Sequence, residues 1–129
     1  MISSRQPTIL LCDDNPLNRK LITAMLTGMP YRIREASSGR EALATVFSEH
    51  ESIDLILLDI SMKDVSGVEV CQAIRCSDQE RHRVVPIIAY TANAMTDECE
   101  QYISIGFNDV LTKPTTLVNL MRILHTYLA

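Results

Sequence analysis

Leu55-Ile56-Leu57-Leu58-Asp59 places one carboxylate directly after four apolar residues, and this stretch decides the fold. Three further apolar runs also end in polar or charged residues: Thr8 to Cys12 before Asp13-Asp14, Val84 to Tyr90 before Thr91-Ala92, and Phe107 to Thr112 before Lys113-Pro114. Runs this short and continuous are typical of buried strands. We therefore predict that charged and hydroxyl groups gather where the strands end.

Segments with helical spacing separate the runs, and a further short strand is predicted from Tyr31 to Ala36. Asn15-Pro16 is a good helix start, Ser38 and Ser66 are candidate caps, and the polar stretch 77–83 is predicted to be a loop. Five strands alternating with five helices predict an α/β fold, a doubly wound parallel sheet covered on both faces. Such sheets bind ligands beyond the carboxyl ends of their strands.

Length and composition limit the classes of protein that fit. With 129 residues and 47% hydrophobic content, the chain is predicted to form one domain over residues 8–129, preceded by a flexible tail over 1–7. A net charge of -4 argues against direct binding of nucleic acid. No apolar run is long enough to cross a membrane, and the four cysteines lack CxxC spacing. We expect reduced thiols, a cytoplasmic location and no membrane contact by this domain.

The carboxylates Asp13, Asp14 and Asp59 suggest a metal site. An acid pair could merely complement the positive end of the first helix, but Asn15 already supplies a cap. Asp59 could be a simple turn residue at a strand end. Three crowded carboxylates favour a cation, and hard oxygen ligands suit Mg²⁺. Asp59, at the end of a central strand, is then a candidate nucleophile toward a phosphoryl group.

Lys113 and Thr91 complete the predicted site. Lys113 could simply solubilise a strand end, with Pro114 starting the last helix, and Thr91 taken alone is more typical of an ordinary strand residue. A lysine held by a rigid prolyl bond, which could be cis, can instead direct its ammonium at one phosphate oxygen, with the isomer fixing the loop that presents it. Thr91 and the Ala92 amide would donate further hydrogen bonds. Phosphoryl transfer requires this kind of positioning and charge neutralisation.

Taken together, these motifs resemble the receiver domain of two-component response regulators, over essentially the whole chain. The stretch Ala89 to Ala94, with Gly106 to Asp109 and Lys113-Pro114, is most similar to the receivers of hybrid sensor histidine kinases. The resemblance implies a flavodoxin-like (βα)5 fold with strand order 2-1-3-4-5. It also implies these roles: Asp13 and Asp14 as metal ligands, Asp59 as phosphoacceptor and ligand, the Ser61 carbonyl as a ligand to Mg²⁺, Thr91 as switch hydroxyl, and Lys113 as the lysine that pairs with the phosphate.

A receiver takes its phosphoryl group from a histidine kinase or a histidine phosphotransfer domain and passes the signal to a downstream protein. The resemblance thus implies no enzyme activity beyond self-phosphorylation and autodephosphorylation, although the parent protein could be a membrane-anchored histidine kinase. Homodimerisation stays open. Val118 and Ile123, which are predicted to lie beyond the buried stripe of the last helix, could serve an interface or could equally form peripheral core. Two residues depart from the family pattern: Lys63 stands where the family usually has proline, and Val110 where it usually has tyrosine or phenylalanine. Tyr90 is an aromatic residue near Val110.

Four alternatives remain at this stage. The chain could be a stand-alone regulator, or a receiver that serves only as a docking module. A haloacid-dehalogenase-like phosphatase would need a second acid two residues after Asp59, where Ser61 stands. A flavodoxin-like cofactor binder would need a phosphate-binding loop after Asp13-Asp14, where two acids would repel a phosphate.

Overall fold

In the computed structural model, which describes residues 6–128, the sheet has five parallel strands in the order β2-β1-β3-β4-β5. The strands are β1 (Thr8–Cys12), β2 (Arg32–Ala36), β3 (Leu55–Asp59), β4 (Ile87–Thr91) and β5 (Asp109–Thr112). The central strands β1, β3 and β4 are buried along their whole length, because helices cover both faces. The predicted doubly wound fold and strand order are confirmed. The predicted tail over 1–7 falls mostly on residues 1–5, which lie outside the described part.

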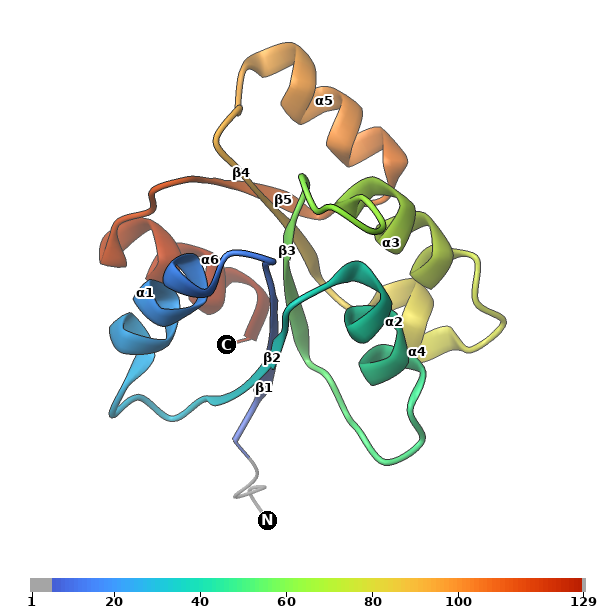
Figure 1. Ribbon diagram of the computed structural model, residues 1–129, viewed down its shortest axis with the longest axis horizontal. Coiled ribbons are helices and arrows are strands. Elements are labelled where there is room, and N and C mark those ends of the chain that lie inside the picture. Colours follow the sequence, from blue (N-terminus) through green and yellow to red (C-terminus); the bar gives the residue numbers. More distant parts are fainter. Residues whose placement is uncertain (1–5, 129) are drawn as a thin grey trace.

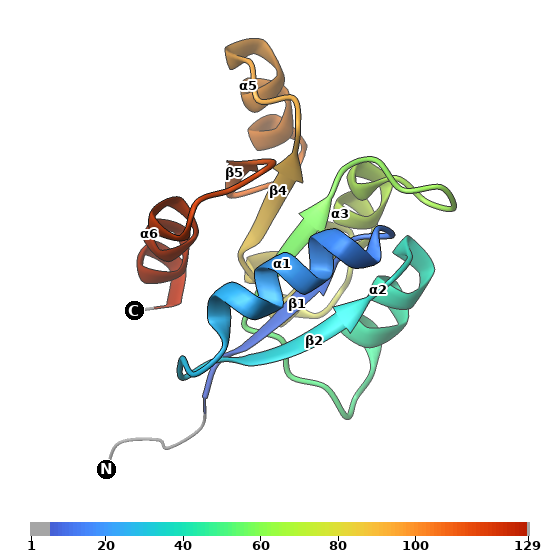
Figure 2. The ribbon, with the colours of Figure 1, turned by 60° about the vertical axis from the view of Figure 1, so that its left-hand side comes forward.

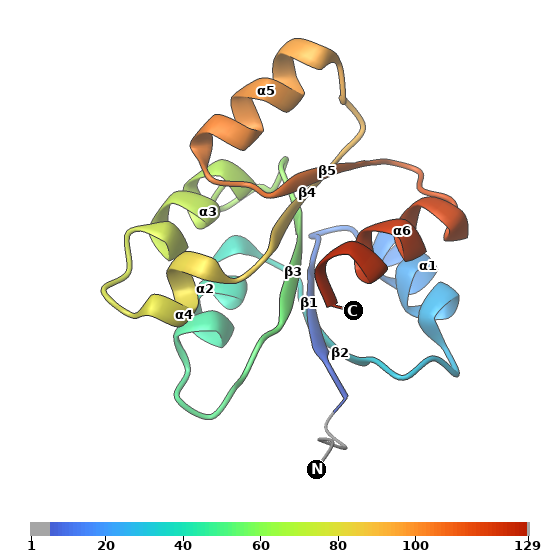
Figure 3. The ribbon, with the colours of Figure 1, turned by 180° about the vertical axis from the view of Figure 1, so that it is seen from behind.

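Helices form a layer on each side of this sheet (Figures 1 and 3). One face carries α1 (Pro16–Leu26) and α6 (Leu117–Leu128), and the other carries α2 (Gly39–Phe47) and α3 (Gly67–Arg75). The short helix α4 (Glu80–Val84) follows α3, and α5 (Thr96–Ile105) lies near the β5 edge. None of the residues of α5 is fully buried, so this helix is the least enclosed of the described elements.

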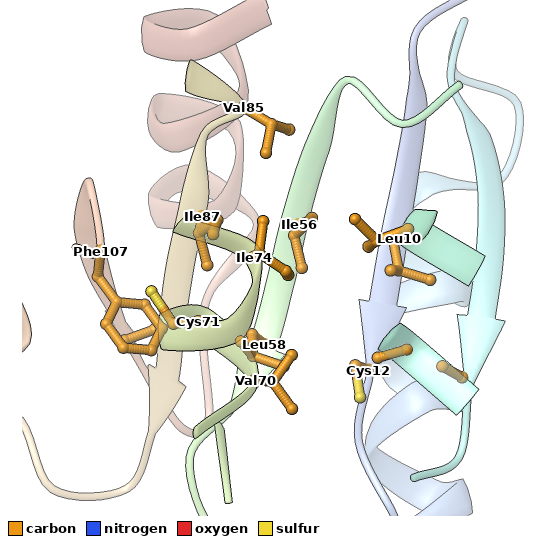
Figure 4. Close-up of a cluster of buried hydrophobic side chains, with 14 residues drawn as sticks. Leu10, Cys12, Ile56, Leu58, Val70, Cys71, Ile74, Val85, Ile87 and Phe107 are labelled. Atoms are coloured by element: carbon orange, nitrogen blue, oxygen red, sulfur yellow. The ribbon is translucent and has the colours of Figure 1, made fainter. Parts of the chain in front are cut away.

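Alternate residues of the strands contribute to two separate hydrophobic cores, one on each face of the sheet. Leu10, Ile56 and Leu58 face α2 and α3, where Val70, Cys71 and Ile74 meet them (Figure 4). The intervening strand residues face α1 and α6; this second core includes Leu11, Leu57, Ile22, Leu120 and Leu124. Cys12 and Cys71 are free thiols buried in this structure. Because one core packs against each face of the sheet, the ends of the strands are held in fixed positions relative to one another.

The segment after α3 differs from the prediction. The polar stretch 77–83 is not all loop, because Glu80–Val84 forms α4, and β4 begins at Ile87 rather than Val84. His82 is buried there and contacts Ser77 Oγ at 2.7 Å and the Val46 carbonyl at 3.2 Å through its two ring nitrogens. These tertiary contacts support a helix that has only one buried residue. A pattern of apolar residues could not reveal it.

A second correction concerns α6. Val118 and Ile123 are both predicted to lie outside its buried stripe, at an interface or in the peripheral core; Ile123 is instead fully buried in the core, whereas Val118 is 79% exposed. The predicted caps at Asn15, Ser38 and Ser66 are confirmed, since each side chain accepts a backbone N–H of its own helix. These caps start α1, α2 and α3 beyond the carboxyl ends of the strands. Figure 2 shows the strand arrows running toward that end of the sheet.

Candidate functional site

Three carboxylates meet at the carboxyl ends of β1 and β3. One oxygen from each of Asp13, Asp14 and Asp59 lies within 4.8 Å of the other two. Asp59 ends β3 and Asp13 directly follows β1, and these strands are neighbours in the sheet. Asp13 is 0% and Asp59 3% exposed, while Asp14 is partly buried. The acidic cluster expected from the sequence is therefore formed.

The ammonium of Lys113 lies between two of these acids. Its Nζ is 2.8 Å from Asp59 Oδ1 and 3.0 Å from Asp13 Oδ2. Lys113 follows β5, and its N–H donates to the Thr91 carbonyl at 2.8 Å, which extends the pairing of β5 with β4. The Lys113-Pro114 peptide bond is cis. The ring centroid of the buried Tyr90 lies 5.0 Å from the same Nζ, a cation–π distance.

Burial and hydrogen bonding act in opposite directions on the pKa values of Asp59 and Lys113. Burial raises the pKa of Asp59, the hydrogen bond from Lys113 opposes that shift, and the charge of Asp13 adds to it. Burial lowers the pKa of Lys113, but its hydrogen bonds with Asp59 and Asp13 outweigh this, and the net shift is upward. Lys113 is therefore a permanent ammonium at neutral pH. With three carboxylates around one ammonium, the site carries an excess of negative charge.

A divalent cation fits this set of donors. Asp13 Oδ2 is buried and makes no hydrogen bond beyond its ion pair with Lys113, while Asp13 Oδ1 accepts the N–H of Asn15 at 2.9 Å. A buried carboxylate oxygen without enough partners is costly, and a cation relieves that cost. Carboxylates crowded this closely are the ligands that Mg²⁺ prefers. The predicted role of the Ser61 carbonyl stays a prediction; the Ser61 N–H donates to Asp59 Oδ1 at 3.2 Å.

Thr91 lies at the same end of the sheet, but its hydroxyl points into its own loop. Its Oγ1 accepts the N–H of Asn93 at 3.1 Å and lies 3.5 Å from the Asn93 carbonyl. The Asn93 side chain in turn donates to Glu98 Oε1 at 3.0 Å, which ties the loop to the first turn of α5. The structure thus joins Asp13, Asp14, Asp59 and Lys113, and it holds the Thr91 hydroxyl in a separate turn.

Two residues that the sequence analysis did not single out support the acids. A Cβ at Gly67 would lie 2.2 Å from the Asp59 carbonyl oxygen and 2.8 Å from Ile60 Cα, so no larger residue fits. Arg19 Nη1 donates to the Asp13 carbonyl at 2.6 Å. A glycine directly after a helix cap was a signal that could have indicated the first contact. The second joins residues six positions apart through the conformation of a long side chain, which the sequence spacing does not reveal.

The two departures from the expected pattern have structural counterparts. Val110 is partly buried and packs against the core beneath α3. Tyr90 is 3% exposed and belongs to the core on the opposite face, which includes α1 and α6. Lys63 contributes its backbone N–H to Asp14 Oδ2 at 3.2 Å, a hydrogen bond that a proline could not make.

Comparisons with a family profile and with individual proteins agree on one family. The profile described as "Response regulator receiver domain" matches residues 9–125. The sensor histidine kinase GacS of Pseudomonas protegens is 38% identical over 114 residues, which cover 88% of this chain and 12% of that protein. The histidine-protein kinase BarA of Escherichia coli K12 is 35% identical over 120 residues, 93% of this chain and 13% of that protein. The chain thus spans about an eighth of the length of these relatives.

Solved structures give the same result for the fold. The receiver domain of a Pseudomonas aeruginosa sensor histidine kinase, which has a magnesium ion coordinated in its active-site cleft, superposes with a TM-score of 0.82 at 38% identity, covering 94% of this chain and 96% of that one. The chemotaxis protein CheY4 of Vibrio cholerae gives a TM-score of 0.85 at 26% identity, with 95% and 99% covered. Among residues 6–128, no helix is long and apolar enough to cross a membrane.

Proposed function

The chain belongs to the response regulator receiver domain family, a family of phosphoacceptor domains, and on this basis we propose which of its residues carry the function. Asp59 accepts the phosphoryl group, Asp13 and Asp14 bind Mg²⁺ together with Asp59 and the Ser61 carbonyl, and Lys113 pairs with the product. The observation that carries this assignment is the position of Lys113 Nζ, 2.8 Å from Asp59 and 3.0 Å from Asp13 within the acidic cluster.

In the transfer step, a carboxylate oxygen of Asp59 attacks phosphorus of a phosphohistidine. The O–P bond forms as the N–P bond breaks, and the imidazole leaves with the electron pair and takes up a proton from solvent. The product is an acyl phosphate on Asp59. When bound, Mg²⁺ neutralises the oxygens of the transferred phosphoryl group, the main requirement of such a reaction. Asp13 and Asp14 lie beside the nucleophile, which supports this mechanism.

Lys113 and Thr91 then stabilise the product. Lys113 is already aimed at Asp59 and can transfer its hydrogen bond to a phosphate oxygen. The Thr91 hydroxyl must exchange its contact with Asn93 for one with the phosphate. This exchange would shift a pre-existing equilibrium of the loop before α5, and the altered surface would be recognised by the downstream protein. We include self-phosphorylation from small phosphodonors and autodephosphorylation in the same proposal, since the same groups would serve both reactions.

We also propose the parent protein, the phosphodonor and the cellular compartment of this domain. The likeness to segments of GacS and BarA supports an origin in a hybrid sensor histidine kinase, with a histidine kinase or histidine phosphotransfer domain as donor. We take the receiver unit to be residues 8–129. The free cysteines support a reducing compartment, the cytoplasm, for this domain.

The assignment of Asp59 is tested by labelling with acetyl phosphate in the presence of Mg²⁺. Asp59→Asn should abolish labelling, and the matched control Asp97→Asn, at an exposed acid in the first turn of α5, should label normally. Chelation of Mg²⁺ should also abolish labelling of the unaltered chain. Undiminished labelling of Asp59→Asn would show that another residue is the acceptor. Sustained turnover of small phosphomonoesters would instead support a phosphatase.

A further inference from the structure

The loop between β3 and α3 is held at two adjacent residues by hydrogen bonds that the proposed chemistry does not use. The N–H of Lys63 donates to Asp14 Oδ2 at 3.2 Å. The carboxylate of Asp64 accepts the N–H of Gly39 through Oδ1 and the N–H of Arg40 through Oδ2, both at 3.0 Å. We call these two contacts anchors. The Lys63 anchor reaches Asp14, a proposed metal ligand, and the Asp64 anchor reaches the amino end of α2.

The first anchor depends on the backbone of Lys63, not on its side chain. The Lys63 side chain is exposed, and the donor is the main-chain N–H. Every residue type except proline supplies this donor. The residue at this position therefore decides whether the Asp14 carboxylate is held from the loop side.

The second anchor is a fixed charge at a helix terminus. The backbone N–H groups of Arg40, Val65 and Gly39 lower the pKa of Asp64 to about 2, so it is ionised throughout the neutral range. The amino end of α2 carries partial positive charge from its unpaired N–H groups, which favours a carboxylate there. Because Asp64 directly follows Lys63, fixing one residue restricts the movement of the other.

We propose that the Lys63 N–H and the Asp64 carboxylate form a loop clamp that orients the Asp14 carboxylate for Mg²⁺, so that Lys63 and Asp64 are positioning residues of the metal site. This inference rests on the proposed function, in which Asp13, Asp14 and Asp59 bind the ion. A metal-binding carboxylate held by a hydrogen bond loses less freedom when the ion binds. Loss of such an outer partner typically weakens metal affinity by about 10- to 100-fold.

The test compares magnesium binding by calorimetry in the full chain and two variants. Lys63→Pro removes the N–H, whereas the matched control Lys63→Ala keeps it and removes only the side chain. We expect Lys63→Pro to bind Mg²⁺ about tenfold more weakly than the unaltered chain, and Lys63→Ala to bind it normally. Equal affinity in the two variants, with normal binding by the unaltered chain, would overturn the clamp alone. Absence of magnesium binding by the unaltered chain would overturn the proposed function as well.

A second variant tests the clamp without introducing a proline, so that distortion of the loop by the proline ring is not the cause of any weaker binding. Asp64→Ala keeps the Lys63 N–H and all three acids of the site, and it should also weaken magnesium binding; Asp78→Ala, at an exposed acid outside the clamp, should not. If both anchors act as one unit, the double variant Lys63→Pro/Asp64→Ala loses less binding free energy than the two single losses combined. Full additivity would contradict the clamp.

A readout without metal completes the test. In the metal-free chain, the Lys63 amide proton should exchange with solvent faster in Asp64→Ala than in the unaltered chain, because the loop opens more often. An unchanged exchange rate would show that Asp64 does not hold Lys63 in place.

Discussion

Replacing Asp59 by asparagine should make the metal-free protein more stable, although it removes the proposed acceptor. The asparagine side chain has nearly the same shape and could still accept the hydrogen bond of Lys113, so the change is mainly the loss of one buried negative charge. That charge lies within 4.8 Å of Asp13 and Asp14 and 2.8 Å from Lys113 Nζ. Whether the substitution stabilises or destabilises depends on which of these interactions is larger.

Coulomb's law with an effective dielectric of about 20 gives the balance. At 2.8 Å the attraction of Asp59 to Lys113 is about 6 kcal/mol, and at the 4.8 Å limit the repulsion from each of the two neighbouring acids is at least about 3.5 kcal/mol, or about 7 kcal/mol together. Repulsion thus exceeds attraction by about 1 kcal/mol, and the cost of burying a charge has the same sign. We expect a gain of about 1 to 2 kcal/mol in the free energy of unfolding. For a domain of this size, this raises Tm by roughly 5 °C.

The gain should depend on pH. Because burial raises the pKa of Asp59 above its ordinary value of 3.8, the folded state prefers the neutral acid. The stability that this preference contributes is fully present below pH 3.8 and is lost as pH rises through the folded pKa. The unaltered chain is therefore penalised at neutral pH, and Asp59→Asn is not. The difference in Tm should be largest near neutral pH and should close as the pH falls toward 3.8.

Thermal unfolding followed by circular dichroism, with a chelator present, measures this difference. Asp97→Asn removes an exposed acid and serves as the control, with no expected gain. Added Mg²⁺ should reverse the order, because it stabilises the unaltered chain by binding the folded state, whereas Asp59→Asn has lost a ligand. A lower Tm for Asp59→Asn without metal at neutral pH would refute the reasoning that the site is overcharged.

Three other substitutions test the surroundings of the acceptor. Lys113→Ala leaves the two buried carboxylates without their cation and should cost about 3 kcal/mol in chemical denaturation, with much slower acetyl phosphate labelling; unchanged stability would contradict the ion-pair geometry. Gly67→Ala forces a Cβ against the Asp59 carbonyl and should cost about 2 kcal/mol or more, whereas Ala73→Ser on the exposed side of α3 should be neutral. Thr91→Ala should still label on Asp59 but should lose the chemical-shift changes of the loop before α5 that phosphorylation causes in the unaltered chain; if those changes persist, the hydroxyl is not the switch.

Much of this architecture could be predicted from the sequence because the relevant signals are local. The strand around Leu57 is apolar on both faces. Asn15 directly precedes α1 and caps it, and the acids stand at strand ends. Neighbouring parallel strands must then bring Asp13 and Asp59 to one edge. The position of Lys113 followed in the same way, from its place directly after β5.

The features that escaped prediction depend on contacts between distant residues. Helix α4 has one buried side chain, His82, and its support comes from Val46 and from Arg75, whose guanidinium donates to the His82 carbonyl at 3.1 Å. Gly67 is required by the approach of another segment's backbone, and Asp64 by the amino end of α2. None of these requirements leaves a periodic pattern in the sequence. The burial of Ile123 escaped prediction because helical spacing alone does not give the width of the buried stripe.

The most direct test of the central claim is to locate the phosphoryl group by mass spectrometry. The chain is incubated with acetyl phosphate and Mg²⁺, the acyl phosphate is trapped by borohydride reduction, and the peptides are sequenced. We predict that the modified residue is Asp59, with no modification at Asp13 or Asp14, and that the modification disappears when Mg²⁺ is chelated. Modification at one of the other two acids, or at Asp59 without any metal, would contradict it.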